Sequence, residues 1–204
     1  MSKIIFIVGP TAIGKTAASF LLARKLGGEI ISADAMQVYE EPKIITSKPP
    51  ADMLKEVKHH FIGMVLARDS YSVFDYFSSA SRVIRDLSSK DIPVVVCGGS
   101  GLYLKAILDG IFEGPGKDDN LRNKLAETAQ AHGNQYLYRK LEAVDPESAK
   151  KISSNDLRRI IRALEVYYLS GKTLSEKKKE AKTFSLTEDK GRAESLRYRL
   201  FKFI

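Results

Sequence analysis

The residues best suited to chemistry lie near the N-terminus, where Gly9-Pro-Thr-Ala-Ile-Gly-Lys-Thr16 fits the pattern G-x-x-x-x-G-K-[ST] without an insertion. Two glycines at this spacing let the backbone curl around an anion, so that several N–H groups point inward. Lys15 adds a full positive charge, and the hydroxyl of Thr16 stands where a Mg²⁺ ion between two phosphates would bind. The pattern therefore predicts a site for a di- or triphosphate, formed by Gly9, Pro10, Thr11, Ala12, Ile13, Gly14, Lys15 and Thr16.

A strand and a helix must hold this loop in place. The apolar run at residues 4–8 predicts a buried strand, and residues 17–26 predict a helix that ends at Gly27. The N-terminus of such a helix adds the positive end of its dipole to the anion site. This order of strand, loop and helix supports a phosphate site over an ordinary glycine turn. The buried side of the helix is expected to carry Ala17, Phe20 and Leu21.

Asp34 is the acidic residue best placed to act beside the loop. It follows a short strand expected at 29–32, and the carboxyl ends of parallel strands meet at one edge of an α/β sheet. At that edge Asp34 is suited to bind a metal, to act as a general base or to cap a following helix. A second glycine-rich turn at 98–101 ends a buried β-branched strand at 91–97, so we expect it beside the first loop.

The pattern of the remaining α/β segments is less regular. Residues 40–57 contain three prolines and predict irregular structure, while further strands and helices are expected at 59–62, 73–87, 102–108 and 198–204. His59 and His60 suggest a metal site, but no third ligand is spaced for one, so packing is favoured. Cys97 is expected to be a small residue of the core.

The chain changes character after Gly114-Pro-Gly116, where it becomes polar, Lys-rich and helical. We therefore divide it into a core domain at 1–116, a helical insertion at 117–190 and a return strand of the core at 191–204. Within the insertion, residues 173–176 fit a capping box.

One helix of this insertion carries a cluster of arginines. Asn155 or Asp156 caps its start, and its apolar stripe is expected to bury Leu157, Ile161, Leu164 and Tyr168. Arg158, Arg159 and Arg162 share another face, because residues three and four apart are neighbours on a helix. Such a face either binds phosphates or is simply solvated.

Composition limits the classes of protein that fit. The 204 residues are 44% apolar, enough for a full core, and the formal net charge of +8 leans toward a polyanionic partner. A single cysteine excludes an internal disulfide and a cysteine metal cluster. No apolar run is long enough to span a membrane, and the early first strand leaves no room for a signal peptide, so we expect a cytoplasmic protein.

Five blocks of the sequence closely resemble the tRNA dimethylallyltransferases, in the right order and over almost the whole chain. They lie at residues 9–16, 31–39, 58–62, 98–106 and 155–166. The resemblance implies an α/β fold with a P-loop NTPase-like parallel sheet flanked by helices and an all-helical insertion domain. Enzymes of this family transfer a dimethylallyl group from dimethylallyl diphosphate to N6 of an adenosine next to the tRNA anticodon, with Mg²⁺. In this family, the glycine loop holds the diphosphate of the prenyl donor. The implied partners are therefore dimethylallyl diphosphate and the tRNA anticodon stem-loop, and we expect a monomer.

The resemblance also implies a role for individual residues, with Asp34, Ser100 and Lys15 as the catalytic ones. Asp34 would take the proton from N6, Lys15 and the loop amides would stabilise the leaving diphosphate, and Thr16 would hold Mg²⁺. Ser100 replaces the family's usual threonine and keeps its hydroxyl. The residues implied to contact tRNA are Asp34, Ala35, Met36, Gln37, Ser100, Arg122, Arg158, Arg159 and Arg162.

Three departures and three rival functions stand beside this resemblance. Ile13 replaces the small residue usual in the family loop, and residues 42–49 differ from the family's usual glycine-containing version. Family members also continue past 198–204, so we expect a truncated form. The rivals are an adenylate isopentenyltransferase, a small-molecule kinase that uses the same loop, and a non-catalytic RNA-binding fragment.

Overall fold

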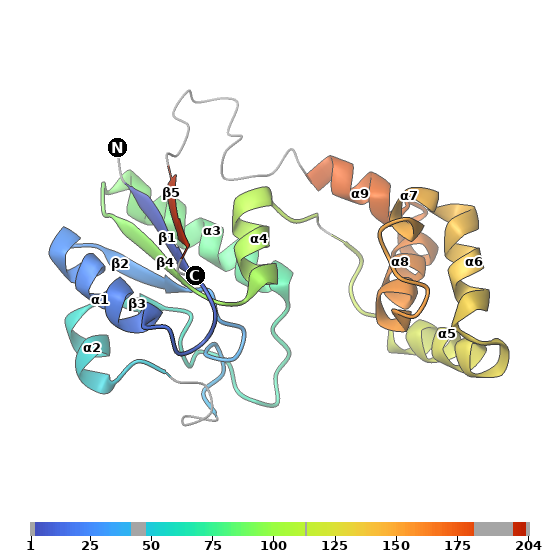
Figure 1. Cartoon of the computed structure of the whole chain (residues 1–204), viewed down its shortest axis with the longest axis horizontal. Helices are drawn as coiled ribbons and strands as arrows, with labels where there is room; N and C mark the ends of the chain where they lie inside the picture. Colours follow the sequence, from blue (N-terminus) through green and yellow to red (C-terminus); the bar gives the residue numbers. More distant parts are fainter. Residues whose placement is uncertain (1–2, 42–47, 113, 182–197, 203–204) are drawn as a thin grey trace. The chain divides into compact units, whose positions relative to one another are not determined.

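The computed structural model describes residues 3–41, 48–112, 114–181 and 198–202. The chain divides into two compact units, one of Met1–Gly110 with Ser185–Ile204 and one of Ile111–Phe184. Figure 1 shows strands and helices in the first unit and helices in the second. The second unit begins before the expected residue 117, because Phe112 packs on the helical core and the Pro115 carbonyl accepts a hydrogen bond from Arg162.

A parallel five-stranded sheet forms the centre of the first unit, with strand order β3-β2-β4-β1-β5. Strands β1 and β4 pair in register from Ile4 with Val94, and β5 pairs in parallel with the other edge of β1. The predicted parallel sheet is thus confirmed. The five strands are β1 (Ile4–Val8), β2 (Glu29–Ser32), β3 (His59–His60), β4 (Val94–Gly98) and β5 (Tyr198–Lys202).

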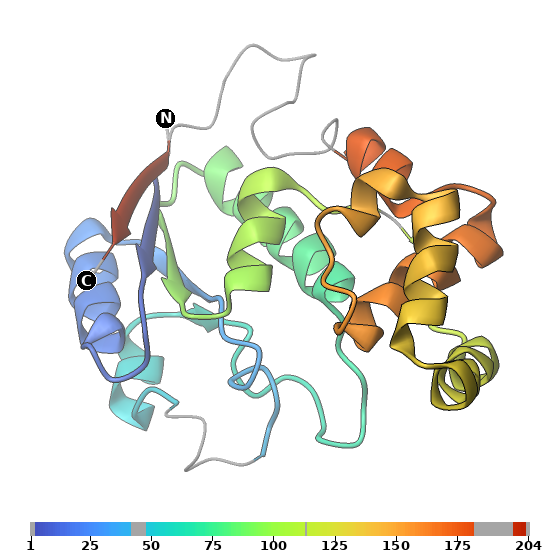
Figure 2. The same ribbon diagram turned by 45° about the vertical axis from the view of Figure 1, so that its right-hand side comes forward.

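Helices cover both faces of the sheet, as Figure 2 shows. Side chains alternate along a strand, so β1 sends Phe6 to one face and Ile5 and Ile7 to the other. The sheet face that carries Phe6 packs against α3 (Val73–Ser89) and α4 (Gly101–Asp109). The sheet face that carries Ile5 packs against α1 (Lys15–Leu26). These helices fix the ends of the strands, where the two glycine turns lie.

Two expectations for this unit were wrong. Ala17 and Leu21 are exposed on α1, whereas Phe20 and Ala23 are buried. Apolar residues occur around most of this helix, so their spacing alone does not identify the buried face. The stretch expected to be irregular contains a short helix, α2 (Ala51–Glu56), which begins after Pro50.

The second unit consists of helices packed around a core of their own. Its largest fully buried apolar side chains are Leu137, Leu141, Ile160 and Leu164. Asp156 is confirmed as the cap of α8, and Thr173 and Glu176 form the predicted capping box. The helices are α5 (Asp119–His132), α6 (Asn134–Val144), α7 (Pro146–Ala149), α8 (Leu157–Ser170) and α9 (Leu174–Ala181).

The buried face of α8 is rotated from the expected stripe. Ile160 and Ala163 are buried beside Leu164, whereas Tyr168 is 48% exposed. Residues 182–197 and 203–204, which belong to the expected insertion and return strand, lie outside the described part of the chain. None of the helices described is both long enough and apolar enough to cross a membrane.

Candidate functional site

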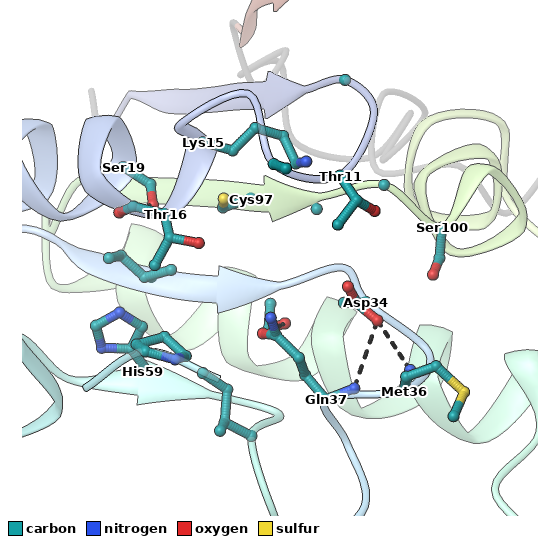
Figure 3. A pocket seen from close by; sticks show the side chains of 18 of the residues that line it. Thr11, Lys15, Thr16, Ser19, Asp34, Met36, Gln37, His59, Cys97 and Ser100 are labelled. Carbon is teal, nitrogen blue, oxygen red and sulfur yellow. Dashed lines mark hydrogen bonds between the residues drawn. The ribbon is translucent and has the colours of Figure 1, made fainter. Parts of the chain in front are cut away.

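The glycine loop between β1 and α1 forms a curled cradle. Gly14 caps α1 in the left-handed region at φ 85°, where a side chain would be strained, and its carbonyl accepts from Ala18 N at 3.0 Å. Helix α1 therefore begins directly at the loop, with its N-terminal N–H groups beside it. Lys15 Nζ donates to the Pro10 carbonyl at 2.5 Å, so this side chain folds back across the loop (Figure 3).

The second glycine turn lies beside the first and leaves little space for side chains. A Cβ at Gly98 would lie under 3.0 Å from the Ala33 carbonyl, and one at Gly99 would lie 3.2 Å from the Gly9 carbonyl. The predicted proximity of the two glycine turns is thus found. Ser100 Oγ accepts from Ala35 N at 2.8 Å, which ties this turn to the end of β2. Its own O–H can still donate to a ligand.

Asp34 lies at the end of β2, within the same cavity. Its Oδ1 accepts from Met36 N at 2.9 Å and from Gln37 N at 3.4 Å, which closes a turn and not a helix. In Figure 3 this oxygen faces the turn, while the second oxygen faces the side of the cavity that holds Lys15. One carboxylate can therefore fix the local backbone and still offer an acceptor to a ligand.

The cavity between these segments has a volume of about 440 Å³, within the usual range for small-molecule sites. It brings together most of the predicted donor and catalytic residues, namely Gly9, Pro10, Thr11, Ala12, Gly14, Lys15, Thr16, Asp34, Met36, Gln37 and Ser100. Ile13 and Ala35 do not line it. Ile13 is partly exposed, and Ala35 reaches the site through its backbone N–H.

Several residues that the sequence did not single out also line the cavity. Ser19 follows Thr16 by three residues and Ser32 ends β2, so helical spacing and strand position could have identified both. Ser32 Oγ donates to Gln37 Oε1 at 3.1 Å, which orients that amide. Burial raises the pKa of the Cys97 thiol, although a hydrogen bond with Ser19 opposes the rise. Cys97 is thus a neutral thiol in the wall.

His59 lines the far part of the cavity, on β3. Its ring Nδ1 lies 2.7 Å from the Val57 carbonyl, which orients the imidazole, and burial lowers its pKa. Its Nε2 is buried without a hydrogen-bond partner in the described part of the chain. Within the same residues no group of three or more His, Cys, Asp or Glu side chains is arranged to hold a metal.

The arginines predicted to bind tRNA belong to the helical unit, where they fall into two pairs. Arg122 and Arg162 both bind the carboxylate of Glu165, whereas Arg158 and Arg159 are exposed. Arg162 therefore differs from Arg158 and Arg159 in its contacts, although helical spacing predicts one face for all three. Sequence reasoning also missed Glu165, whose position inside an apolar run was the available signal.

Comparison with known proteins gives one consistent result. A family model described as IPP transferase matches residues 37–204. A tRNA dimethylallyltransferase of Aquifex aeolicus is 49% identical over 173 residues, which are 85% of this chain and 56% of that protein. A protein of Geotalea uraniireducens named tRNA dimethylallyltransferase 2 is 44% identical over 173 residues, which are also 85% of this chain and 56% of that protein. The chain spans about 56% of the length of these curated relatives.

Solved structures agree with the sequence comparison. A eukaryotic dimethylallyltransferase acting on tRNA superposes with a TM-score of 0.69 at 30% identity, covering 99% of this chain and 48% of that one. The tRNA isopentenylpyrophosphate transferase of Bacillus halodurans has a TM-score of 0.54 at 38% identity, and the match covers 84% of this chain and 57% of that one. The predicted P-loop NTPase-like fold is thereby confirmed.

Proposed function

This chain belongs to the IPP transferase family, and from that premise we propose that it binds dimethylallyl diphosphate and transfers the dimethylallyl group to N6 of an adenosine next to the anticodon of tRNA. The observation that carries the proposal is the presence of Lys15 and Asp34 in one cavity. An anion cradle and a carboxylate acceptor are the two groups that this reaction needs.

The chemistry assigns a separate task to each side of the cavity. An exocyclic adenine amine is a weak nucleophile, so it needs a base for its proton and a well-stabilised leaving group. In the transfer, a bond forms between N6 and the allylic C1, the bond between C1 and the diphosphate oxygen breaks, and N6 loses one proton. Asp34 accepts that proton, while Lys15 and the loop N–H groups bind the negative charge that remains on the diphosphate.

Mg²⁺ fits the same cavity as an ion shared with the donor. It prefers oxygen ligands and keeps several waters, so it does not require a cluster of protein carboxylates. The Thr16 hydroxyl lines the cavity beside the loop and would hold the ion. Bound there, Mg²⁺ supplies positive charge to the diphosphate.

The adenosine has to leave its stack in order to reach Asp34. Asp34, Met36, Gln37 and Ser100 line the cavity, and Ala35 reaches it through its backbone N–H, so these residues are suited to contact an extruded base. The net charge of +8 favours a polyanion such as tRNA over a free nucleotide. These features support tRNA as the acceptor.

The test measures transfer directly. The full chain is incubated with dimethylallyl diphosphate, Mg²⁺ and unmodified tRNA, and the nucleosides of the digested tRNA are analysed by mass spectrometry. We expect one adenosine per tRNA to gain the mass of a dimethylallyl group. Parallel reactions contain AMP in place of tRNA, or ATP in place of the prenyl donor.

Each rival predicts a different outcome. Faster transfer to AMP than to tRNA would indicate an adenylate isopentenyltransferase. Tighter binding and hydrolysis of ATP without prenyl transfer would indicate a kinase-like enzyme. Binding of tRNA with no transfer to any acceptor would leave only the RNA-binding function, and the proposed activity of this chain would be abandoned.

A further inference from the structure

The helical unit contains a buried carboxylate that joins two arginines. Glu165 on α8 is fully buried, and both of its oxygens accept hydrogen bonds. Arg122 donates to it from Nε at 2.7 Å and from Nη2 at 2.9 Å, and Arg162 donates from Nη1 at 2.5 Å. The backbone N–H of Asp118 completes the set at 2.9 Å. The arrangement crosses from α5 to α8.

The two arginines bring more positive charge to Glu165 than the burial of one carboxylate requires. The same unit buries Asp145, which is 2% exposed and accepts from Ser148 N and Ser175 N at 3.0 Å each. Backbone N–H groups and serine side chains are therefore sufficient to satisfy a buried acid in this unit, without an arginine. A single bidentate arginine would likewise neutralise Glu165. The second cation needs another explanation.

The side chains of both arginines remain partly accessible. The side chains of Arg122 and Arg162 are 33% and 35% exposed. Each arginine has five N–H donors, and Arg122 gives two bonds to Glu165, while Arg162 gives one to Glu165 and one to the Pro115 carbonyl at 3.1 Å. The planes of both guanidinium groups are thus fixed, and each keeps further donors for a ligand.

The acidic neighbours of this pair are already engaged. Asp118 caps α5 by accepting from Leu121 N at 2.9 Å, and Asp119 pairs with Lys117 at 2.5 Å. Glu165 is the acid that contacts the two arginines directly. Fixed guanidinium forks of this kind suit a phosphate, whose oxygens accept two parallel hydrogen bonds.

We propose that Glu165 is a positioning residue, which holds Arg122 and Arg162 in the orientation that binds a backbone phosphate of tRNA. The inference rests on the proposed function, because it takes tRNA as the partner. It differs from general electrostatic attraction, since Arg158 and Arg159 are exposed, and the partner of Arg159 is Asp156 at the surface rather than a buried acid. Fixed side chains lose less entropy when they bind, so the pair is expected to contribute more affinity than two mobile arginines.

The direction in which tRNA affinity changes distinguishes a positioning role of Glu165 from a simple effect of its charge. Binding of fluorescently labelled, unmodified tRNA to the full chain is measured by anisotropy over a range of KCl concentrations. Glu165→Gln removes a negative charge, so general electrostatics predicts tighter binding. Positioning predicts the opposite, and we expect affinity to fall roughly tenfold, the scale of one charge-assisted hydrogen bond.

Two variants in the same unit serve as controls. Asp145→Asn alters a buried acid that touches no arginine, and Glu147→Gln removes a charge at the surface. Both are expected to bind tRNA as tightly as the unchanged chain or more tightly, at a temperature where circular dichroism shows every variant folded. A loss of affinity in Asp145→Asn equal to that in Glu165→Gln would show a general effect of destabilisation and overturn the proposal.

A third variant keeps the test decisive if Glu165→Gln does not fold. Arg122→Lys keeps the charge and Glu165 but removes the guanidinium fork, so we expect a similar loss of affinity. The slope of log K against log salt should change little, because the charge that displaces counterions is kept. Unchanged affinity in Arg122→Lys would refute the role of the fork.

The outcomes also separate this inference from the proposed function. If the unchanged chain binds and prenylates tRNA but Glu165→Gln binds it equally well or better, only the positioning role fails. If the unchanged chain does not bind tRNA, both fail.

Discussion

The stability of the helical unit is expected to depend on pH through Glu165. Burial alone would raise the pKa of this carboxyl, but hydrogen bonds from Arg122, the Asp118 N–H and Arg162 outweigh it, and the pKa falls from 4.5 to about 2. The folded unit therefore holds Glu165 as a carboxylate at pH values where the unfolded chain binds a proton. Protonation removes the negative charge that both arginines pair with.

The size of the effect follows from this difference in pKa. One pKa unit corresponds to about 1.4 kcal/mol, so the fall from 4.5 to about 2 corresponds to on the order of 3 kcal/mol of folding free energy. Since the folded pKa lies below the unfolded value, this contribution is complete above about pH 4.5 and is lost as the pH falls toward 2. Glu165→Gln should remove it at pH 7 and change little near pH 2.

The assay is urea unfolding of both proteins at a series of pH values, followed by far-ultraviolet circular dichroism. The difference in unfolding free energy between the unchanged chain and Glu165→Gln should be largest at neutral pH and shrink in acid. Glu147→Gln serves as the control, because Glu147 is an exposed carboxylate paired with Lys151 and Lys179. Exposed pairs stabilise little, so this variant should unfold like the unchanged chain.

A direct titration provides the refutation. In a protein labelled with ¹³C at the glutamate carboxyl groups, the Glu165 resonance should shift well below the pH at which exposed glutamates titrate. A Glu165 resonance that titrates with the exposed glutamates, or a Glu165→Gln variant of unchanged stability at pH 7, would refute the assignment of Glu165 as a charged, doubly paired group.

Three further predictions concern the cavity. Asp34→Asn keeps an Oδ1 acceptor for Met36 N and Gln37 N, so donor affinity should stay within about twofold while transfer falls roughly a hundredfold; a near-normal rate would exclude a general base there. Lys15→Ala should weaken dimethylallyl diphosphate binding by roughly tenfold or more in calorimetry, and unchanged affinity would remove Lys15 from the anion site. Gly98→Ala should lower the melting temperature strongly, because its Cβ would meet the Ala33 carbonyl, whereas Gly101→Ala has open space; equal melting temperatures would contradict the close packing of the turn.

The sequence predicted the α/β core well because its signals are local. Strands β1 and β4 are continuous apolar runs, and each is followed at once by glycines, so strand ends and turns were read from neighbouring residues. Asp34 was located by the same reasoning, since it follows β2 directly. A parallel sheet then brings these three strand ends to one edge, as the cavity demonstrates.

The faces of the helices were harder to predict. Leu21 on α1 and Tyr168 on α8 were expected to be buried, but they are 54% and 48% exposed. Both helices carry apolar residues at several angles, so more than one stripe satisfies the helical period. The packing partners decide between these stripes, and they lie far away in the sequence.

The arginines show that a partner distant in the sequence can decide which role a charged side chain has. Sequence spacing treats Arg158, Arg159 and Arg162 alike, and it treats a glutamate as a residue of the surface. Arg122 and Glu165 are 43 positions apart, and their bond exists only when α5 packs on α8. A substitution at Arg158 therefore alters the electric field at the surface, whereas one at Arg122 also alters geometry. Salt should weaken the first effect more than the second, because partly buried pairs are less screened.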